Sequence, residues 1–315
     1  MTHLALVLAQ LCFASLSIAG KLAFQGGNPI PPHALVMARM LGGALVFWAI
    51  ARQRGPVRVE RGDRGLLVVC ALLGVVFNQV LFINGLARTT AVSASLISAT
   101  IPVFTALFAV LLGRERFQWT RALGIALAMS GVFVLFDVRH LSTAGSHLLG
   151  NLMCVLNCAS YAMFLVLVRP LSAKYPPMRL VAMMFLVATL AFTPLGVAAW
   201  VELWPRVGTP ELVLLAFIVA VPTVGAYSLT QLGLARAESS LVATYIYLQP
   251  MFATLGAVIV LHEPLRPQAG IAAALIFMGV WVSTRPARSA GPPSPTRRDP
   301  DPPSPPGSTA TAAGR

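Results

Sequence analysis

Long apolar runs separated by short polar connections fill the chain from its start to about residue 285. Most runs come close to the roughly 20 residues that an α-helix needs to cross a bilayer. They are continuous rather than alternating, which excludes the strands of an outer-membrane barrel. The pattern predicts ten transmembrane helices, at about residues 4–22, 33–51, 65–84, 91–112, 120–136, 149–168, 178–199, 211–230, 240–261 and 269–284.

Residues 85 to 134 are repeated 148 positions later without a gap. The block Gly85–Arg88 returns as Gly233–Arg236, and Pro102 and Glu115 return as Pro250 and Glu263. The start of each copy also aligns, at a slightly different offset, where Pro31-Pro32 corresponds to Pro176-Pro177. We therefore predict two homologous domains, a first repeat at 4–136 and a second repeat at 149–284.

Each copy contains five of the predicted helices. Because five is an odd number, the second copy must enter the membrane in the opposite orientation to the first. Inverted repeats of this kind build secondary transporters, in which the solute binds near the bilayer midplane between the halves. The predicted fold class is an all-α membrane protein whose ten transmembrane helices form two inverted five-helix repeats.

Composition and charge agree with a membrane protein and set its orientation. The chain is 57% hydrophobic and 10% charged, with a net charge of +13. Such basicity would suggest nucleic acid in a soluble protein, but most arginines fall in alternate loops, as expected for cytoplasmic loops of a membrane protein. We expect both termini in the cytoplasm and no nucleic-acid partner. Residues 285–315 are rich in proline and predict a disordered cytoplasmic tail.

A set of polar and small residues at fixed places in both copies carries a family resemblance. The set comprises Lys21, Arg39, Gly85-Leu86-x-Arg88, Pro102, Glu115 and Gly131, with the second-copy residues Gly233-Leu234-x-Arg236, Pro250, Glu263 and Gly279. Over residues 4–284 the chain resembles the EamA-type permeases of the drug/metabolite transporter superfamily. The resemblance implies ten helices, a central cavity walled mainly by helices other than the fifth and tenth, and movement of small metabolites. It leaves the solute open, because members handle amino acids, nucleotide precursors and drugs.

Arg39 is the charged residue placed deepest in a predicted helix. A charge in the bilayer is costly, so the guanidinium should face the helix bundle or water. It either binds a carboxylate or phosphate of the solute, or it snorkels outward or pairs with a neighbouring carbonyl.

Amide and phenol side chains inside the other predicted helices are the remaining candidates for solute binding. A buried amide needs a hydrogen-bond partner, which is either the solute or another helix. The candidates are Asn78, Gln79, Asn157, Tyr161, Tyr227 and Gln249.

Five residues are candidates for a gate or hinge. Lys21 lies at the end of the first helix, where it either anchors at the membrane surface or forms a basic entrance with Arg39. Pro102 and Pro250 should kink their helices. Glu115 and Glu263 end their helices, where either a salt bridge to arginine or a role in gating or proton coupling would explain a carboxylate.

Small residues in the fifth and tenth helices predict close helix packing. They are Gly124, Ala128 and Gly131 in the fifth helix and Gly270, Ala274 and Gly279 in the tenth. We expect these positions to support the fold rather than to contact solute.

The sequence favours a carrier over the competing classes of membrane protein. An intramembrane enzyme would need catalytic residues, but the five histidines lie near helix ends or in loops. A channel would show charged rings or a repeated pore loop, and neither is present. The four cysteines are read as packing residues, so we expect no metal and no cofactor.

The predicted function is therefore a permease that exports a small polar metabolite, such as an amino acid or another zwitterionic or anionic solute, by alternating access. Its expected partners are that small-molecule solute and the lipid bilayer. We expect the protein to act as a monomer or a homodimer, and the sequence assigns no coupling ion. High arginine, alanine and proline content suggests a bacterial source and hence the bacterial inner membrane.

Overall fold

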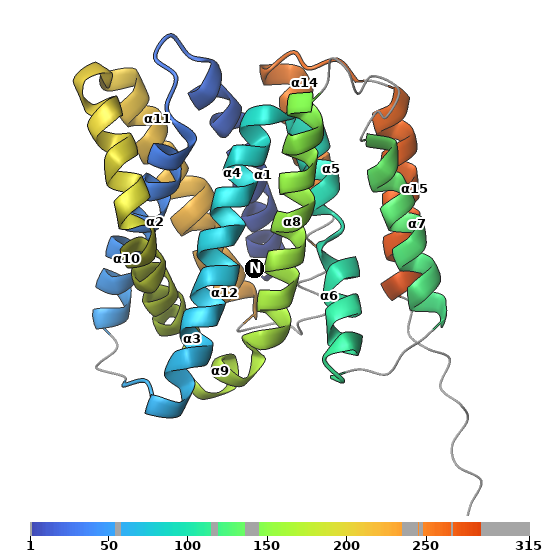
Figure 1. Cartoon of the computed structure of the whole chain (residues 1–315), viewed down its shortest axis with the longest axis horizontal. Coiled ribbons are helices and arrows are strands. Elements are labelled where there is room, and N and C mark those ends of the chain that lie inside the picture. The colour runs from blue at the N-terminus through green and yellow to red at the C-terminus, as the bar shows by residue number, and fades with distance from the viewer. Residues whose placement is uncertain are drawn as a thin grey trace, which may run out of the picture. The chain divides into compact units, whose positions relative to one another are not determined.

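Helices are the regular elements throughout the part of the chain that the computed structural model describes, residues 2–53, 58–114, 119–135, 145–234, 245, 248–265 and 267–284. Figure 1 shows their arrangement. The first part of the chain forms α1 (Thr2–Gln25), α2 (Pro32–Arg52), η1 (Arg61–Asp63), α3 (Arg64–Ala71), η2 (Leu72–Phe77), α4 (Asn78–Arg88), α5 (Ala91–Ser98), α6 (Ile101–Leu111) and α7 (Trp119–Leu135). The second part forms α8 (Gly145–Leu167), α9 (Arg169–Lys174), α10 (Pro177–Leu203), η4 (Trp204–Arg206), α11 (Thr209–Val219), η5 (Ala220–Gly225), α12 (Ala226–Leu234), α14 (Leu248–Val260) and α15 (Pro267–Thr284). The predicted tail at 285–315 lies outside the described residues.

The helices are those of a multi-span membrane protein. Within the described residues, seven helices are long and apolar enough to cross a bilayer, and three shorter apolar helices accompany them. Large apolar side chains such as Trp119, Leu190 and Leu195 point outward and are 82%, 66% and 58% exposed, as lipid-facing positions require. The prediction of an all-α membrane protein is confirmed.

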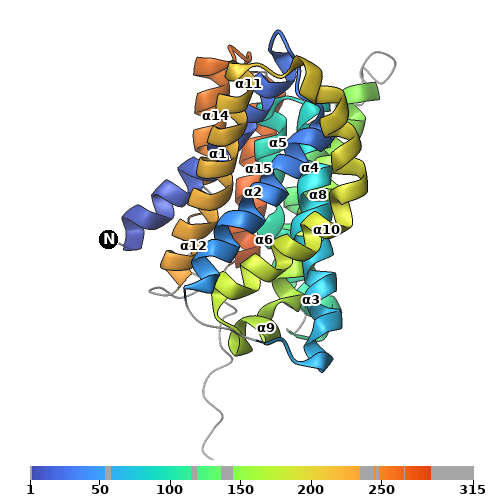
Figure 2. The same ribbon diagram turned by 90° about the vertical axis from the view of Figure 1, so that its left-hand side faces the viewer.

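Proline starts two helices that pack side by side, α2 and α10 (Figure 2). Each follows a Pro-Pro pair whose first residue is extended, with φ and ψ of −58° and 137° at Pro31 and −57° and 132° at Pro176. The second proline takes the first helical position, where its missing N–H costs no hydrogen bond. The indole of Trp200, late in α10, donates to the carbonyl of Ala34, in the first turn of α2, at 3.1 Å and so joins the two helices.

Two predicted transmembrane helices contain a π-helical turn in their middle. The turn η2 connects α3 to α4, and the turn η5 connects α11 to α12. The second begins 148 positions after the first, at residue 220 against residue 72, which is the spacing of the sequence repeat. π-Helical turns are rare and are found frequently at functional sites.

The predicted fourth helix, at 91–112, is not continuous. It is divided into α5 and α6 at Ala99-Thr100, and Pro102 lies in the first turn of α6. Because proline has no N–H to donate to the preceding turn, the helix restarts at Thr100, whose carbonyl accepts from the N–H of Val103 at 2.9 Å. We predicted a kink near Pro102, and the structure shows a two-residue interruption at Ala99-Thr100, where both residues keep right-handed helical backbone angles. Pro250 lies buried near the start of α14.

The pair α7 and α15 packs through backbone atoms and small side chains (Figure 1). A Cβ added to Gly131 would lie 2.9 Å from the carbonyl of Ala272, and one added to Gly279 would lie 2.6 Å from the carbonyl of Gly124. Position 131 thus faces 272 while 279 faces 124, so the two helices are antiparallel and each contact has a counterpart 148 positions away. The prediction for Gly270 was wrong, because that glycine is exposed and a Cβ added to it would meet no atom of another helix within 4 Å. Ala274 is likewise exposed. Ala272 and Ile276 make the contact instead, since they lie on the face of α15 that turns toward α7.

Candidate functional site

A cavity of about 130 Å³ lies among the helices. A buried water needs roughly 10–15 Å³ of such space, so there is room for on the order of ten water molecules or one small solute. Its described lining residues come from α1, α2, α4, α5, α6, α8, α12 and α14: Gln10, Phe13, Leu16, Arg39, Asn78, Phe82, Ser98, Ile101, Asn157, Tyr161, Tyr227, Thr230 and Gln249. None of these comes from α7 or α15.

Arg39 alone is charged among these lining residues. Its side chain is 4% exposed, and its Nε donates to the hydroxyl of Thr223 at 3.0 Å. Neither aspartate nor glutamate is among the described lining residues, so no lining carboxylate neutralises the guanidinium. The hydrogen bond uses Nε and leaves the two terminal nitrogens available, which is the pair that binds a carboxylate or phosphate in a bidentate manner.

Two asparagines of the cavity come from opposite parts of the chain and contact one another. The side-chain amide of Asn157 on α8 donates to the backbone carbonyl of Asn78, 2.7 Å away. One turn further along α8, the hydroxyl of Ser160 donates to the carbonyl of Leu73 at 2.8 Å. Both acceptors belong to the π-helical turn η2 or follow it directly, so α8 holds that turn in place.

Aromatic rings form much of the remaining wall. Tyr227 on α12 makes edge-to-face contacts with Phe13, Phe47 and Phe185, with ring centroids 5.7, 6.1 and 5.4 Å apart. Such contacts hold the phenol of Tyr227 in one orientation at the cavity surface. Tyr161 on α8 also lines the cavity, and its ring packs on Phe164.

The structure therefore brings together six of the seven residues that the sequence suggested for solute binding, namely Arg39, Asn78, Asn157, Tyr161, Tyr227 and Gln249. The seventh, Gln79, does not line the cavity. It is 1% exposed, and neither its amide nitrogen nor its amide oxygen has a hydrogen-bond partner. Consecutive helical residues are about 100° apart, so the neighbour of a lining residue faces elsewhere.

Sequence reasoning missed several lining residues. Gln10 is 2% exposed, and its Oε1 has no hydrogen-bond partner. An amide within the first predicted helix is the same signal that identified Asn78, so Gln10 was recognisable. The apolar residues Phe13, Leu16, Phe82 and Ile101 carry no such signal, because lipid-facing and cavity-facing apolar residues look alike in sequence.

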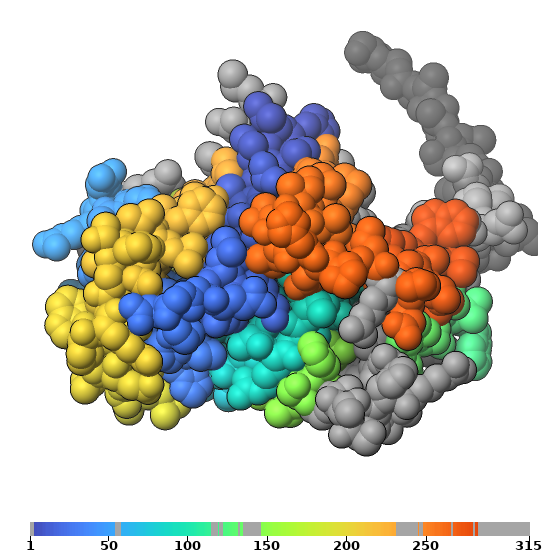
Figure 3. Space-filling view, turned by 90° about the horizontal axis from the view of Figure 1, so that it is seen from above, coloured from blue at the N-terminus to red at the C-terminus, as the bar shows by residue number. Residues whose placement is uncertain are grey.

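Two residues suggested as a gate, Lys21 near the end of α1 and Glu263 just after α14, lie near one another. Figure 3 views the molecule from above and shows the orange segment of α14 beside the blue segments of the first helices. The carboxylate of Glu263 accepts the backbone N–H groups of Ala91 and Val92 at 2.9 and 3.2 Å. It therefore caps the start of α5, where the helix dipole favours a negative charge. Lys21 is 8% exposed and buried, unlike an anchor at the membrane surface. Neither residue lines the cavity.

Glu115, the repeat counterpart of Glu263, lies outside the described residues. In that part of the chain which is described, no group of three or more histidine, cysteine, aspartate or glutamate side chains is arranged to hold a metal ion.

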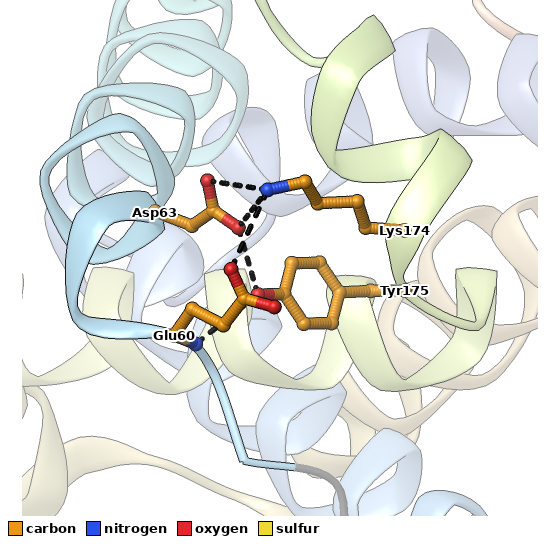
Figure 4. Close-up of polar contacts among 4 residues, drawn as sticks. All are labelled: Glu60, Asp63, Lys174 and Tyr175. Atoms are coloured by element: carbon orange, nitrogen blue, oxygen red, sulfur yellow. Dashed lines mark hydrogen bonds and ion pairs between the residues drawn. The ribbon is translucent and has the colours of Figure 1, made fainter.

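A second cluster of charged residues lies at the opposite end, where α3 begins and α9 ends (Figure 4). The ammonium of Lys174 lies 3.0 Å from Asp63 Oδ2 and 3.6 Å from Glu60 Oε2. The hydroxyl of Tyr175 donates to Asp63 at 2.8 Å and accepts the backbone N–H of Glu60 at 3.1 Å. The hydrogen bond that Lys174 donates to Asp63, together with the negative charge of both carboxylates, raises the pKa of Lys174. These contacts join the segment before α3 to the segment before α10.

Comparison with known proteins identifies the kind of molecule to which this cavity belongs. The model of the EamA-like transporter family matches residues 1–137 and again residues 148–285. The chain belongs to the EamA-like transporter family. It is thus a multi-pass membrane protein of the drug/metabolite transporter superfamily, as the sequence resemblance indicated.

Similar proteins agree with this assignment. An uncharacterized transporter of Archaeoglobus fulgidus is 27% identical over 287 residues, which cover 90% of this chain and 97% of that protein. A probable terminal-alkyne amino-acid exporter of Streptantibioticus cattleyicolor is 29% identical over 248 residues, 75% of this chain and 80% of its own. A protein of known crystal structure has a TM-score of 0.61 over 90% of this chain and 96% of its own, at 21% identity, and so supports the fold alone. The family description and the names of the two sequence relatives are those of transporters.

Proposed function

We propose that this EamA-family transporter is a secondary carrier that exports a small carboxylate-bearing metabolite, with an amino acid as the leading candidate. It works by alternating access between two inverted five-helix repeats. The main support for this proposal is the position of Arg39, a buried cation that faces a cavity whose other described lining residues are uncharged. A buried charge is costly unless it is paired, so an anionic group of the solute supplies the partner that the cavity lacks.

The remaining lining residues suit the rest of such a solute. Amide and hydroxyl groups of Gln10, Asn157, Tyr161 and Gln249 offer donors and acceptors, while Phe13 and Phe82 provide apolar surface. The cavity volume of about 130 Å³ fits a small metabolite rather than a large drug. The similar protein from Streptantibioticus cattleyicolor is named a probable terminal-alkyne amino-acid exporter, which supports an amino acid as the solute proposed here.

The contact between α7 and α15 supports the two-state part of the proposal. These helices are antiparallel, and the contacts of Gly131 are repeated by Gly279, its counterpart in the sequence repeat. Such reciprocal contacts are expected when two repeats are related by a two-fold axis in the membrane plane. Opposite orientation of the repeats makes inward-open and outward-open states nearly equivalent.

The distribution of basic residues supports a cytoplasmic location for both termini in a bacterial inner membrane. The described residues Arg52, Arg58, Arg61, Arg64, Arg114, Arg169 and Lys174 lie in loops or helix ends at the end where α3 begins, the lower end in Figure 1. The opposite end carries fewer, such as Arg88 and Arg206. Positive charge marks the cytoplasmic side of a membrane protein.

The test is an efflux assay in liposomes that contain the purified protein and are loaded with a labelled amino acid. We expect saturable efflux of the amino acid, and little or no efflux of the matching amino-acid amide, in which an uncharged carboxamide replaces the carboxylate. Non-saturating flux would indicate a channel, and saturable movement of both solutes would retain the carrier but reject the carboxylate.

The matched variants are Arg39→Gln and Arg206→Gln, which remove the same charge from different places. Arg206 is exposed and pairs with Glu202 one helical turn away, far from the cavity lining. Arg39→Gln should lower kcat/KM by at least about tenfold, which corresponds to roughly 1.4 kcal/mol, whereas Arg206→Gln should transport normally. Equal activity of the two variants would remove Arg39 from the binding site.

A further inference from the structure

Each of the two π-helical turns, or the residue that follows it, is hydrogen-bonded by side chains from the other repeat. The turn η5 in the second repeat is reached by Arg39 of the first repeat, whose Nε donates to Thr223. The turn η2 in the first repeat is reached by Asn157 and Ser160 of the second repeat. The two turns begin 148 residues apart, so the turns are equivalent in the repeat, whereas the side chains that reach them come from different helices, α2 and α8.

At both turns a side-chain hydroxyl donates to a backbone carbonyl. In η5 the hydroxyl of Thr223 donates to the carbonyl of Ile218 at 2.9 Å, five residues earlier in the chain. The same hydroxyl oxygen accepts from Arg39, so one fully buried side chain links the turn to the cavity cation. In η2 the carbonyl of Leu73 accepts from Ser160. Buried backbone groups need such partners inside a membrane.

The residues that fasten the turns are also residues that face the solute. Arg39 and Asn157 both line the cavity, whereas Thr223 and Ser160 are not among its described lining residues. A solute that draws Arg39 or Asn157 toward itself therefore weakens the bond that holds the turn of the opposite repeat. Thr223 lies between the lining residue Arg39 and the backbone of its helix, whereas Asn157 bonds directly to the residue that follows η2.

Close to the end of η2 lies a buried side-chain amide, that of Gln79, which none of these hydrogen bonds involves. Gln79 follows η2 by two residues, and both polar atoms of its buried amide lack a partner. A change of one residue in the register of α4 would turn this amide by about 100° and give it new surroundings. A buried amide without a partner is expected in a segment that adopts a second arrangement.

We propose that η2 and η5 respond to occupancy of the cavity, with Thr223 as the positioning residue that connects solute at Arg39 to η5 and Asn157 as the lining residue that connects solute to η2. The proposal rests on the carrier function proposed above. Solute at Arg39 loosens η5, and solute at Asn157 loosens η2, so one molecule acts on both repeats. The turns are then the places at which the third and eighth transmembrane helices change direction during the transport cycle.

Hydrogen–deuterium exchange of the solute-free protein in nanodiscs tests the connection without any transport. Arg39→Lys keeps the charge but lacks the Nε that contacts Thr223, and we expect about tenfold faster amide exchange in residues 218–227, with residues 72–79 unchanged. Ser160→Ala should instead speed exchange in residues 72–79 and leave residues 218–227 unchanged. Thr193→Val is the matched control, because Thr193 makes an ordinary bond to the carbonyl of Thr189, four residues earlier on α10. Exchange in 218–227 that is equal in Arg39→Lys and Thr193→Val would overturn the proposal.

Transport kinetics separate a positioning role from a merely structural one. Thr223→Ser retains the hydroxyl and should transport like the wild type, while Thr223→Val should raise KM about tenfold because Arg39 loses its orientation. Identical kinetics for the two variants would overturn the role of Thr223 in binding. If the wild type shows no saturable transport, the carrier function fails, and the exchange experiment still decides whether Arg39 is connected to η5.

Discussion

The pair α7–α15 and the helices around the cavity use the same apolar composition for opposite purposes. The pair contains uninterrupted helices whose contact is made by Gly131, Gly279 and small neighbours, and none of the described cavity-lining residues comes from it. The cavity helices carry buried amides and an arginine, and two of them contain a π-helical turn. The difference shows that one region is built for close packing and the other for polar contacts and altered backbone.

The physical cause of this division is the lipid solvent. Lipid tails are as apolar as leucine, so helices associate through close contact rather than by hiding apolar surface, which favours glycine at the seam. Irregular backbone is tolerated only where protein groups or a water-filled cavity satisfy it. The π-helical turns accordingly occur in helices that border the cavity, where Arg39, Asn157 and Ser160 supply partners.

The largest effect is expected from a bulky residue in the α7–α15 contact. Gly279→Leu would drive its side chain into the backbone of Gly124 and Ala128, which cannot move aside without separating the helices. We expect loss of most folded protein, measured by size-exclusion chromatography of detergent extracts. Gly270→Leu on the same helix is the control, because nothing lies within 4 Å of that position. Equal yields of the two variants would contradict the assignment of this seam.

The opposite effect is expected in the cavity region at Gln79. Gln79→Met keeps the size of the side chain but removes two buried polar atoms that have no partner. The variant should be more stable by about 1–3 kcal/mol, seen as a higher Tm, and its transport rate should fall. A lower Tm would mean that the amide is satisfied in the membrane-embedded protein, and the contrast between the two regions would weaken.

A smaller effect is expected at Glu263, which belongs to neither region and caps α5. Glu263→Gln retains one acceptor oxygen but loses the negative charge at the helix start. A loss of about 0.5–2 kcal/mol is typical for a helix cap, so the Tm should fall modestly with KM unchanged. A change in KM without a change in Tm would instead give Glu263 a direct role in gating.

The smallest effect is expected at the cluster of Glu60, Asp63, Lys174 and Tyr175 (Figure 4). Lys174→Met should lower the Tm slightly, because the Lys174 side chain is 51% exposed and water screens its ion pairs. The folded state raises the pKa of Lys174, so its contribution is fully present below the ordinary lysine pKa of 10.5 and is lost as the pH rises through the folded value. The Tm difference between variant and wild type should therefore be constant from neutral pH to about pH 9. A difference that changes within that range would point to another titrating group.

Particular residues show how far sequence reasoning reached. Arg39 and Asn157 were identified because a polar group within an apolar run must find a partner, whatever the details of the fold. Gly279 was identified by its repeat partner Gly131, whereas the neighbouring Gly270 was wrongly included because spacing alone does not tell which face of a helix meets its neighbour. Gln79 was grouped with Asn78 for the same reason, although only Asn78 lines the cavity.

The sequence by itself determined the membrane class, the helix boundaries to within a few residues for most of the helices and the twofold repetition, because hydrophobic length and internal similarity are local or linear properties. Only the tertiary structure decided that Glu263 caps α5 and that two helices contain π-helical turns. These features depend on hydrogen bonds between residues far apart in the chain, such as Arg39 with Thr223 and Asn157 with Asn78. A pattern along one segment carries no record of the side chain that another segment brings to it.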